Sequence, residues 1–524
     1  MSPRTVSSTI STSLATKSPA DLDVDTLVLA SVPDGEAARL ADGHDLPNKV
    51  VKALNAALAA VNATGKPASQ VALPAPSGVK ARRVVVTGLG DTPVAEGGDV
   101  LRRAAGVATR GATGSVAVAI PHADVAGLAA VVEGALMGAY AYPGIRGAKA
   151  TDGSTGDRKN KRSSETPAGS TKVTSLSVVT STGKSAAVAV RRAEVLADAV
   201  SWARDLVNTP PNRLTPQAFV EAVQEQVKAA GVKIAVTVLD ENELREQGFG
   251  GITGVGQGSA NPPRIVRLSW TPKSSSAAPV AFVGKGITFD SGGLNIKPGS
   301  SMATMKSDMA GAAAVAAATI AAAVLDVRVP VTTYLGLAEN MPGGNAQRPG
   351  DVVTMRDGTT VEILDTDAEG RMVLGDCLCL ASQEGAERIV DVATLTGACV
   401  VALGTRVTGV MGNDEAFTQE VLGAAQTAGE QMWPLPLPED LRASLDSPFA
   451  DLAHKGDRWG GALTAGLFLE RFAATPGDRT PITWAHLDIA GPSYNEGAPW
   501  GHVPKGGTGA AVPTLLTLLE NHAH

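Results

Sequence analysis

The sequence predicts an α/β protein made of two α/β domains, and three observations carry this prediction. Short β-branched runs bounded by Gly, Pro and Asp alternate with helical stretches along most of the chain, as in layered α/β folds. The chain has 524 residues, enough for two large domains or about three to four smaller ones. Hydrophobic residues make up 44% and charged residues 19%, which provides a large core and excludes a wholly disordered chain or a charged coiled coil.

The N-terminal domain is expected over residues 1–194. Its predicted strands lie at 26–31, 83–88, 115–121 and 173–181, and its predicted helices at 47–63 and 100–108. The Ser/Thr-rich start has no apolar stretch of the kind found in secretory signals, so we expect a frayed tail there. Residues 150–172 are polar and rich in Gly, Ser and Thr, which predicts an exposed insertion whose basic cluster at 158–162 is a solvated loop.

The larger C-terminal domain is expected over residues 195–524, after a boundary inside a helix predicted at 185–207. Its pattern predicts a mixed sheet flanked by helices. The strands are expected at 232–239, 264–269, 280–283, 329–337, 361–364, 388–395 and 483–489, and the helices at 240–247, 310–323 and 372–382. The uncharged run 309–325 is short for a membrane span and rich in alanine, so we expect a buried helix and no membrane association.

Net charge, aromatic content and cysteine content indicate which partners and which cellular compartment to expect. The 45 Lys and Arg residues against 52 Asp and Glu residues give a net charge of −7, which disfavours nucleic acid as a partner. Aromatic residues make up 3%, too few for extensive base stacking. Cys377, Cys379 and Cys399 cannot form a disulfide framework, so we expect packed core thiols in a cytoplasmic protein.

Charged side chains gather in a first segment, where an apolar strand is expected to end. Lys285 and Asp290 lie in the Gly-rich stretch that follows the strand at 280–283. Ligands of α/β proteins bind at such carboxyl ends of strands. Asp308 immediately precedes the Ala-rich helix, where a helix N-cap is the alternative interpretation.

A second charged segment follows the strand at 361–364. Asp367 and Glu369 are two residues apart, and Arg371 continues the alternation. In an extended segment these three side chains project to one side of the chain. A solvated edge strand is the alternative interpretation of this segment.

Four carboxylates from the two segments would repel one another strongly if they met without cations. Oxygen-rich sites suit Mg²⁺ or Mn²⁺, and Zn²⁺ also accepts carboxylates. A pair of metals is a common solution for hydrolysis. The seven histidines are dispersed and form no His-x-x-x-His pair, so we expect a carboxylate-based site.

At these residues the sequence resembles the leucyl aminopeptidase (cytosol aminopeptidase) family of dinuclear metallopeptidases. The Asn-Thr-Asp-Ala-Glu-Gly-Arg signature is present as Asp365-Thr-Asp-Ala-Glu-Gly-Arg371, and the blocks Gly284-Lys-Gly-Ile-Thr-Phe-Asp-Ser-Gly-Gly293 and Lys306-Ser-Asp-Met-Ala-Gly311 also match. The resemblance is strong over 195–515 and loose before it. Asp365 departs from the usual Asn, and we expect altered hydrogen bonding around the ligands rather than lost metal.

The resemblance implies two divalent metal ions per subunit, with Mn²⁺ expected first and Zn²⁺ as the alternative. Asp290 and Glu369 would bridge the metals, Asp367 would complete the first site, and a neutral Lys285 with Asp308 would complete the second. A metal-bridging hydroxide would attack the scissile carbonyl. Lys297 would stabilise the oxyanion, and Arg371 would hold a bicarbonate that acts as general base. The residues implied to line the substrate pocket are Met305, Thr394 and Gly397.

The implied activity is a metal-dependent aminopeptidase that removes N-terminal residues, preferably leucine, from short peptides. The implied assembly is a homo-oligomer, a hexamer with active sites facing an interior cavity. A dinuclear phosphoesterase is the alternative hydrolase, although more histidine ligands would be expected there. A scaffold or DNA-binding protein that has lost the chemistry is the alternative of another class, and the intact motif positions argue against it.

Overall fold

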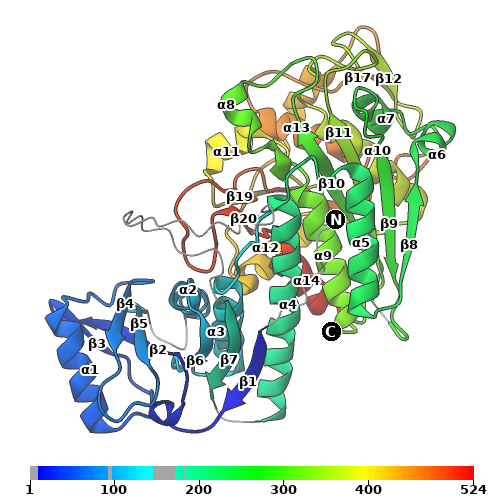
Figure 1. Ribbon diagram of the computed structural model, residues 1–524. Helices are drawn as coiled ribbons and strands as arrows, with labels where there is room; N and C mark the ends of the chain where they lie inside the picture. Colours follow the sequence, from blue (N-terminus) through cyan, green and yellow to red (C-terminus); the bar gives the residue numbers. More distant parts are fainter. Residues whose placement is uncertain (1–9, 93–96, 146–171, 181–182, 276, 524) are drawn as a thin grey trace, which may run out of the picture. The chain divides into compact units, whose positions relative to one another are not determined.

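The computed structural model describes residues 10–92, 97–145, 172–180, 183–275 and 277–523 (Figure 1). The chain forms two compact units, one of Ser8–Ala193 with Trp500–His502 and one of Glu194–Pro499 with Val503–His524. The division falls inside helix α4 (Lys184–Asn208). The predicted insertion at 150–172 and its basic cluster at 158–162 lie outside the described residues, apart from Lys172.

The first unit contains a largely parallel sheet in the order β1-β7-β6-β2-β5-β4, with β3 paired to β2. β3 and β4 are antiparallel to their neighbours, and the other pairs are parallel. The strands are β1 (Ser11–Ala15), β2 (Thr26–Asp34), β3 (Ala37–Leu40), β4 (Gln70–Pro74), β5 (Arg83–Gly88), β6 (Gly114–Val118) and β7 (Val173–Val179). The helices are α1 (Asn48–Ala60), α2 (Gly98–Thr109) and α3 (Val125–Gly138), after a short 3-10 turn at Pro19–Asp21.

The expectation of a frayed N-terminal tail is wrong for residues 11–15. They form β1, which pairs in parallel with β7, so that Ser11 lies opposite Ser175. The segment is polar and half-exposed, and it has no apolar alternation that would identify a strand. Its hydrogen-bonding partner lies about 160 residues away in sequence, which a local pattern cannot show.

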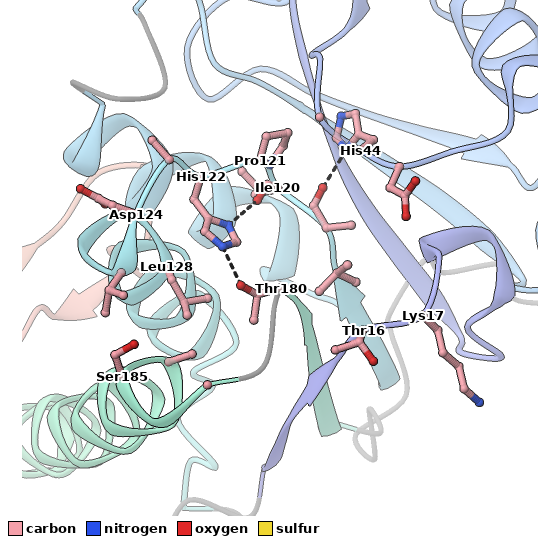
Figure 2. A pocket seen from close by; sticks show the side chains of 18 residues that line it. Thr16, Lys17, His44, Ile120, Pro121, His122, Asp124, Leu128, Thr180 and Ser185 are labelled. Carbon is pink, nitrogen blue, oxygen red and sulfur yellow. Dashed lines mark hydrogen bonds between the residues drawn. The ribbon is translucent and has the colours of Figure 1, made fainter.

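A cavity of about 620 Å³ lies at the carboxyl ends of β1, β6 and β7 in this unit (Figure 2). His122 contacts Thr180 Oγ1 through Nε2 at 2.9 Å and the Ile120 carbonyl through Nδ1 at 3.1 Å. The ring nitrogens of His44 lie 2.8 and 2.9 Å from the carbonyl oxygens of Ala119 and Ala30. Both imidazoles are therefore held by polar groups of the unit itself.

The second unit is built on an eight-stranded mixed sheet in the order β16-β15-β18-β14-β10-β11-β9-β8. The four central strands β18, β14, β10 and β11 are parallel, and β9, β8 and β15 are antiparallel to their inner neighbours. The strands are β8 (Ile234–Leu239), β9 (Arg264–Trp270), β10 (Val280–Asp290), β11 (Val331–Asn340), β14 (Arg388–Ala393), β15 (Thr408–Gly412), β16 (Met432–Pro434) and β18 (Thr483–Asp488). The predicted mixed sheet flanked by helices is confirmed.

Helices pack on the central strands of this sheet. The helices are α5 (Pro216–Ala230), α6 (Glu241–Glu246), α7 (Gly250–Gly256), α8 (Gly299–Met302), α9 (Ala310–Val324), α10 (Gly370–Gln383), α11 (Gly397–Leu403), α12 (Glu415–Ala428), α13 (Gly461–Glu470) and α14 (Val512–His522). Successive residues of β10 point to opposite faces of the sheet and meet different helices. A Cβ on Gly284 would meet Ala312 of α9, whereas Val283 packs in a cluster with Val373 of α10. The segment 305–324, which contains α9, is apolar and long enough to cross a membrane, but 94% of its most apolar part is buried inside the fold. This burial confirms the predicted buried helix.

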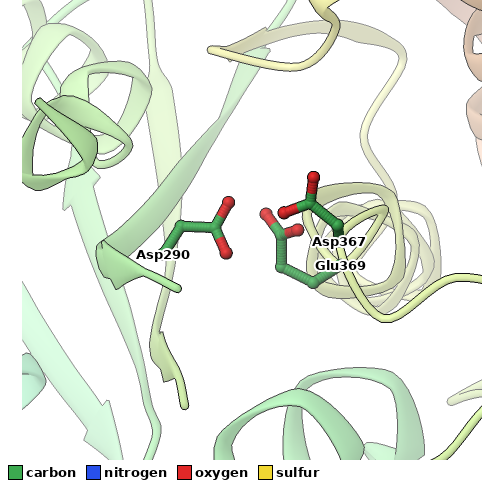
Figure 3. A group of neighbouring side chains, drawn as sticks. All are labelled: Asp290, Asp367 and Glu369. Atoms are coloured by element: carbon green, nitrogen blue, oxygen red, sulfur yellow. The ribbon is translucent and has the colours of Figure 1, made fainter. Parts of the chain in front are cut away.

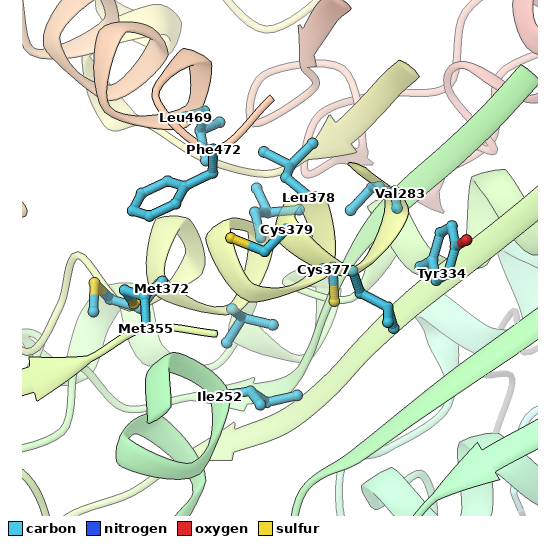
Figure 4. Packing of buried hydrophobic residues seen from close by; sticks show 14 of the residues in the cluster. Ile252, Val283, Tyr334, Met355, Met372, Cys377, Leu378, Cys379, Leu469 and Phe472 are labelled. Atoms are coloured by element: carbon cyan, nitrogen blue, oxygen red, sulfur yellow. The ribbon is translucent and has the colours of Figure 1, made fainter. Parts of the chain in front are cut away.

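The core around α10 contains two of the cysteines (Figure 4). Cys377 and Cys379 are buried in it together with Met355 and Phe472, and Cys399 is buried elsewhere in the unit. All three thiols are free, as the sequence predicts. Burial raises the pKa of each of these thiols, which keeps them protonated and inert.

Two small sheets complete the second unit. One has the order β12-β13-β17 and contains β12 (Val352–Thr354), β13 (Thr360–Glu362) and β17 (Leu452–Ala453). The other pairs β19 (Tyr494–Asn495) with β20 (Gly506–Gly507), and 3-10 turns lie at Met305–Ser307 and Glu439–Leu445. Because β17 runs parallel to β13, the chain after Ala453 lies beside the segment that leads from β13 into α10.

Candidate metal centre

Three carboxylates meet where β10 ends and α10 begins (Figure 3). Asp290 is the last residue of β10, Asp367 lies in the turn before α10, and Glu369 is the N-cap residue of that helix. One oxygen of each lies within 4.8 Å of the others. The two charged segments that the sequence singles out therefore converge, and each alternative that left them as unrelated surface features is wrong.

The conformation of the second segment differs from the expected extended one. Residues 365–368 form a turn in which the Ala368 N–H donates to the Asp365 carbonyl at 3.0 Å, and Glu369 already has helical φ and ψ of −72° and −33°. Arg371 lies inside α10. The alternation by two thus does not explain why these side chains meet, because a turn into a helix brings them together instead.

Lys285 lies within a strand and not in a loop, because β10 continues seven residues beyond the predicted end at 283. Its side chain is buried, and Nζ lies 2.9 Å from the Asp308 carboxylate, 2.8 Å from Glu369 and 2.9 Å from the Thr394 carbonyl. Gly370 makes room for it: a Cβ there would lie 2.5 Å from Lys285 Cε. The absence of a side chain at Gly370, in the second charged segment, therefore leaves space for the Lys285 side chain from the first.

Asp308 is not a helix N-cap. The N-cap of α9 is Met309, which makes no side-chain cap, and the Asp308 carboxylate instead accepts from Lys285 and from Thr394 Oγ1, at 2.6 Å. Asp308 is buried at the same centre as the other three acids.

Lys297 lies on the other side of the carboxylates. Its Nζ is 2.7 Å from Asp290 and 2.5 Å from Asp367, and 15% of its side chain is exposed. Its backbone N–H donates to the Ser291 carbonyl at 2.9 Å, which fixes the loop after β10. The two lysines thus contact different pairs of acids.

The electrostatics of the centre show an excess of negative charge. Burial raises the pKa of Asp290, Asp308 and Asp367, and neighbouring carboxylates add to the effect. Burial lowers the pKa of Lys285 and Lys297, but the surrounding acids raise it by more, so both lie above the ordinary lysine value. Four carboxylates and two ammonium groups leave a formal charge of −2, which cations would neutralise.

Arg371 is buried beside this centre. Its Nη1 donates to the His454 carbonyl at 2.9 Å, while Nε is buried with no partner among the described residues. Burial lowers the pKa of Arg371 to about 10 despite the nearby acids Glu369, Asp365 and Asp488. A planar guanidinium with an unused N–H is suited to holding a small oxyanion.

Of the three residues expected to line the pocket, Thr394 contacts the centre directly. Thr394 follows β14 and contacts both Lys285 and Asp308. Gly397 begins α11, and Met305 lies in the 3-10 turn just before Asp308. The structure therefore places Thr394 in direct contact with two members of the centre.

Two supporting residues were missed from the sequence. Asn340 ends β11 opposite Asp290 and donates through Nδ2 to the Asp290 carboxylate at 2.8 Å and to the Thr366 carbonyl at 3.0 Å. Its place at the carboxyl end of a central strand was the available signal. His454 lies on a distant segment, and no sequence pattern around it indicates a role at this centre.

The donor set fits divalent cations. The centre offers carboxylate oxygens and the Lys285 nitrogen, which would bind a cation once its proton is lost. Glu369 Oε2 is buried with neither a hydrogen bond nor an ion pair among the described contacts. Such a buried, unpaired carboxylate oxygen is costly unless a cation is bound. Oxygen ligands of this kind suit Mn²⁺ and also Zn²⁺.

Comparison with known proteins gives the same family over both units. The catalytic-domain model of the cytosol aminopeptidase family matches residues 201–516, and its N-terminal-domain model matches residues 28–149. A probable cytosol aminopeptidase of Streptomyces griseus is 49% identical over 97% of this chain and 98% of its own length. One from Micrococcus luteus is 48% identical over 96% and 97%.

Solved structures agree. The bottromycin maturation enzyme BotP in complex with Mn is similar with a TM-score of 0.79 and 36% identity, covering 95% of this chain and 100% of that one. A mutant tomato leucine aminopeptidase has a TM-score of 0.80 and 29% identity, covering 98% and 96%.

Proposed function

This chain belongs to the cytosol aminopeptidase family of metal-dependent peptidases that remove N-terminal residues, and we propose that it prefers leucine at the N-terminus of short peptides. The convergence of Asp290, Asp367 and Glu369 with Lys285 and Asp308 in one centre carries the metal-dependent activity, and the similarity to a leucine aminopeptidase supports the preference for leucine. The family's catalytic-domain match over 201–516 supports it.

The proposed ligands divide between two divalent cations. Asp290, which contacts Lys297, and Glu369, which contacts Lys285, would be shared between the two cations. Asp367 would serve the first cation, and Lys285 with Asp308 the second. Mn²⁺ is the first choice because a similar structure is a complex with Mn, and Zn²⁺ is the alternative. Such cations, when bound, hold the attacking water and lower its pKa toward neutrality.

The chain's own residues supply the remaining steps. Lys297, partly exposed beside Asp290, donates to the carbonyl oxygen of the scissile peptide and stabilises the negative charge that develops there. Lys285 and Asp308 would place the second cation where it can also bind the substrate's free α-amino group, which selects a free N-terminus. Arg371, whose Nε–H is unused, would hold a bicarbonate ion that could supply a general base for the attacking water.

Specificity and assembly complete the proposal. Met305, Thr394 and Gly397 line the pocket for the first side chain, which an apolar leucine would fill. We propose two domains over 1–194 and 195–524, with catalysis in the second; the division of the structure between Ala193 and Glu194 lies one residue before this boundary. The protein works in the cytoplasm as a homohexamer, whose mass in sedimentation measurements tests this part.

A chelation experiment tests the function. The protein is treated with EDTA or phenanthroline, its metal content is measured by mass spectrometry, and a panel of aminoacyl-p-nitroanilides is assayed before and after adding Mn²⁺, Zn²⁺, Co²⁺ or Mg²⁺. We expect loss of activity with the metal, recovery with Mn²⁺, and the highest kcat/KM for leucine. Full activity in metal-free protein would contradict the proposal.

A further inference from the structure

The short parallel pair of β13 and β17 brings a distant segment beside the metal loop, defined here as residues 365–371. The pair places Glu362 opposite Ala453, and the His454 N–H continues the ladder by donating to the Glu362 carbonyl at 3.1 Å. Beyond this point the backbone pairing stops, and the side chain of His454 makes the next hydrogen bonds between the two segments.

Both ring nitrogens of His454 contact the backbone where the chain enters the metal loop. Its Nδ1 accepts from the Leu364 N–H at 3.1 Å, and its Nε2 donates to the Asp365 carbonyl at 2.7 Å. The ring is buried, with 1% of the residue exposed. The backbone donor fixes which nitrogen carries the proton, so His454 holds one peptide group of the loop in one orientation.

The backbone of His454 also holds the other end of the metal loop. Its carbonyl accepts from Arg371 Nη1 at 2.9 Å. A single residue therefore contacts the peptide before the loop and the guanidinium at its end. Displacing it would disturb both at once.

Lys455 adds an ion pair to the same loop. Its Nζ contacts the Asp365 carboxylate, whose other oxygen accepts from the Asp367 N–H at 3.0 Å. Asp365 stands where the family signature has Asn, and an Asn oxygen could accept the same N–H without a charge. A carboxylate at this position adds negative charge two residues from Asp367 and needs a cation nearby.

We propose that His454 and Lys455 are positioning residues that fix Asp367 and Arg371, and that Lys455 is required because residue 365 is Asp. This inference rests on the proposed function, since it assigns Asp367 to a metal and Arg371 to catalysis. Without Lys455, the Asp365 carboxylate is repelled by Asp367, turns to solvent and releases the Asp367 N–H. The Asp367 carboxylate is then held less rigidly in the position that binds the metal.

A double-mutant cycle tests the charge pair. The variants are Lys455→Met, Asp365→Asn and the double variant, with Lys273→Met, at an exposed site between β9 and β10, as control. The Mn²⁺ dissociation constant is measured by calorimetry without substrate, and kcat and KM at saturating Mn²⁺. Thermal melting checks that each variant is folded.

We expect Lys455→Met to weaken Mn²⁺ binding by about tenfold, because the loss of a residue that supports a metal ligand commonly has an effect of this size. Asp365→Asn and the double variant should bind Mn²⁺ like the wild type, because Asn keeps the hydrogen bond to Asp367 without the charge. Excess Mn²⁺ should restore kcat in Lys455→Met, since mass action compensates for a weakened equilibrium.

His454→Phe tests the second part of the proposal. It removes both ring contacts, so Mn²⁺ binding should weaken, and kcat should stay low at saturating Mn²⁺ because the backbone carbonyl that accepts from Arg371 is no longer held in place by the ring. Complete recovery of kcat by Mn²⁺ would limit His454 to the metal and overturn its role toward Arg371.

The outcomes separate the two proposals. Unchanged Mn²⁺ binding in Lys455→Met, or a double variant as weak as the single one, would overturn the charge pairing while leaving the proposed function intact. A wild-type protein that binds no divalent cation would overturn both.

Discussion

Replacing Gly370 by Ala should disable the metal centre without touching a charged group. A Cβ at this position would lie 2.5 Å from Lys285 Cε, 2.7 Å from Nζ and 2.8 Å from Cδ. Carbon atoms pack at about 3.5–4.0 Å, so the lysine has to move by about 1 Å. The backbone of β10 is paired on both sides by β11 and β14, so the side chain moves and its contacts with Asp308 and Glu369 are lost.

The effects on activity and on stability differ in size. A displacement of about 1 Å at a catalytic centre can cost about 10²-fold in rate. Overpacking costs about 1–3 kcal/mol of stability, and replacing a helical Gly by Ala returns up to about 1 kcal/mol. The free energy of unfolding should therefore fall by about 0–3 kcal/mol, which leaves the variant folded.

Two matched glycines control for these effects. Gly375→Ala in the same helix would bring a Cβ to 2.7 Å from Met355 Cε and 3.2 Å from Phe472, away from Lys285, and should lower stability alone. Gly423→Ala in α12 has nothing within 4 Å and should leave activity unchanged. The assays are kcat/KM at saturating Mn²⁺, bound Mn²⁺ per chain and urea unfolding. A Gly370→Ala protein with wild-type kcat and two bound Mn²⁺ would refute the reasoning.

Three further variants test the roles of single side chains. Lys297→Ala should lower kcat by about 10²-fold with KM and metal content little changed, because its charge acts in the transition state; a normal kcat with a raised KM would contradict this. Lys285→Ala should instead lower bound metal from two ions toward one and regain part of its activity in excess Mn²⁺; metal content equal to that of Lys297→Ala would mean that the two roles are wrongly assigned. Burial lowers the pKa of His486 but the Asp391 carboxylate, 2.5 Å away, raises it by more, so this pair stabilises the fold below the ordinary value of 6.5 and less as pH rises through the folded value. His486→Gln should remove that slope from the unfolding free energy measured between pH 6 and 8, and an unchanged slope would exclude the pair as its source.

Patterns of local origin were predicted well from the sequence. The strand at 83–88 has the predicted bounds, and the helix predicted at 310–323 differs by one residue. The β-branched run favours a strand and the alanine run favours a helix through their local propensities. Asp290 could be anticipated at the site because ligands bind at the carboxyl ends of parallel strands. Asp367 and Glu369 follow β13 of the separate three-stranded sheet, so their convergence with Asp290 could be anticipated only from the motif resemblance.

Features that depend on distant partners were missed. β1 is held by β7, and β10 runs on through Lys285 because β11 pairs with it as far as Asp290. The turn at 365–368 replaces an expected extended segment because its conformation is held by Asn295 and His454, from two other parts of the chain. No local pattern contains that information.

The departure at residue 365 shows how such a distant partner changes the meaning of a motif. Considered alone, an Asp in place of the signature's Asn adds a negative charge beside a ligand and predicts altered hydrogen bonding around the ligands. In the fold, Lys455 contacts this carboxylate from 90 residues away, and the other carboxylate oxygen still accepts the Asp367 N–H. The departure and the lysine therefore form one unit, so replacing both should be tolerated where replacing the lysine alone is not.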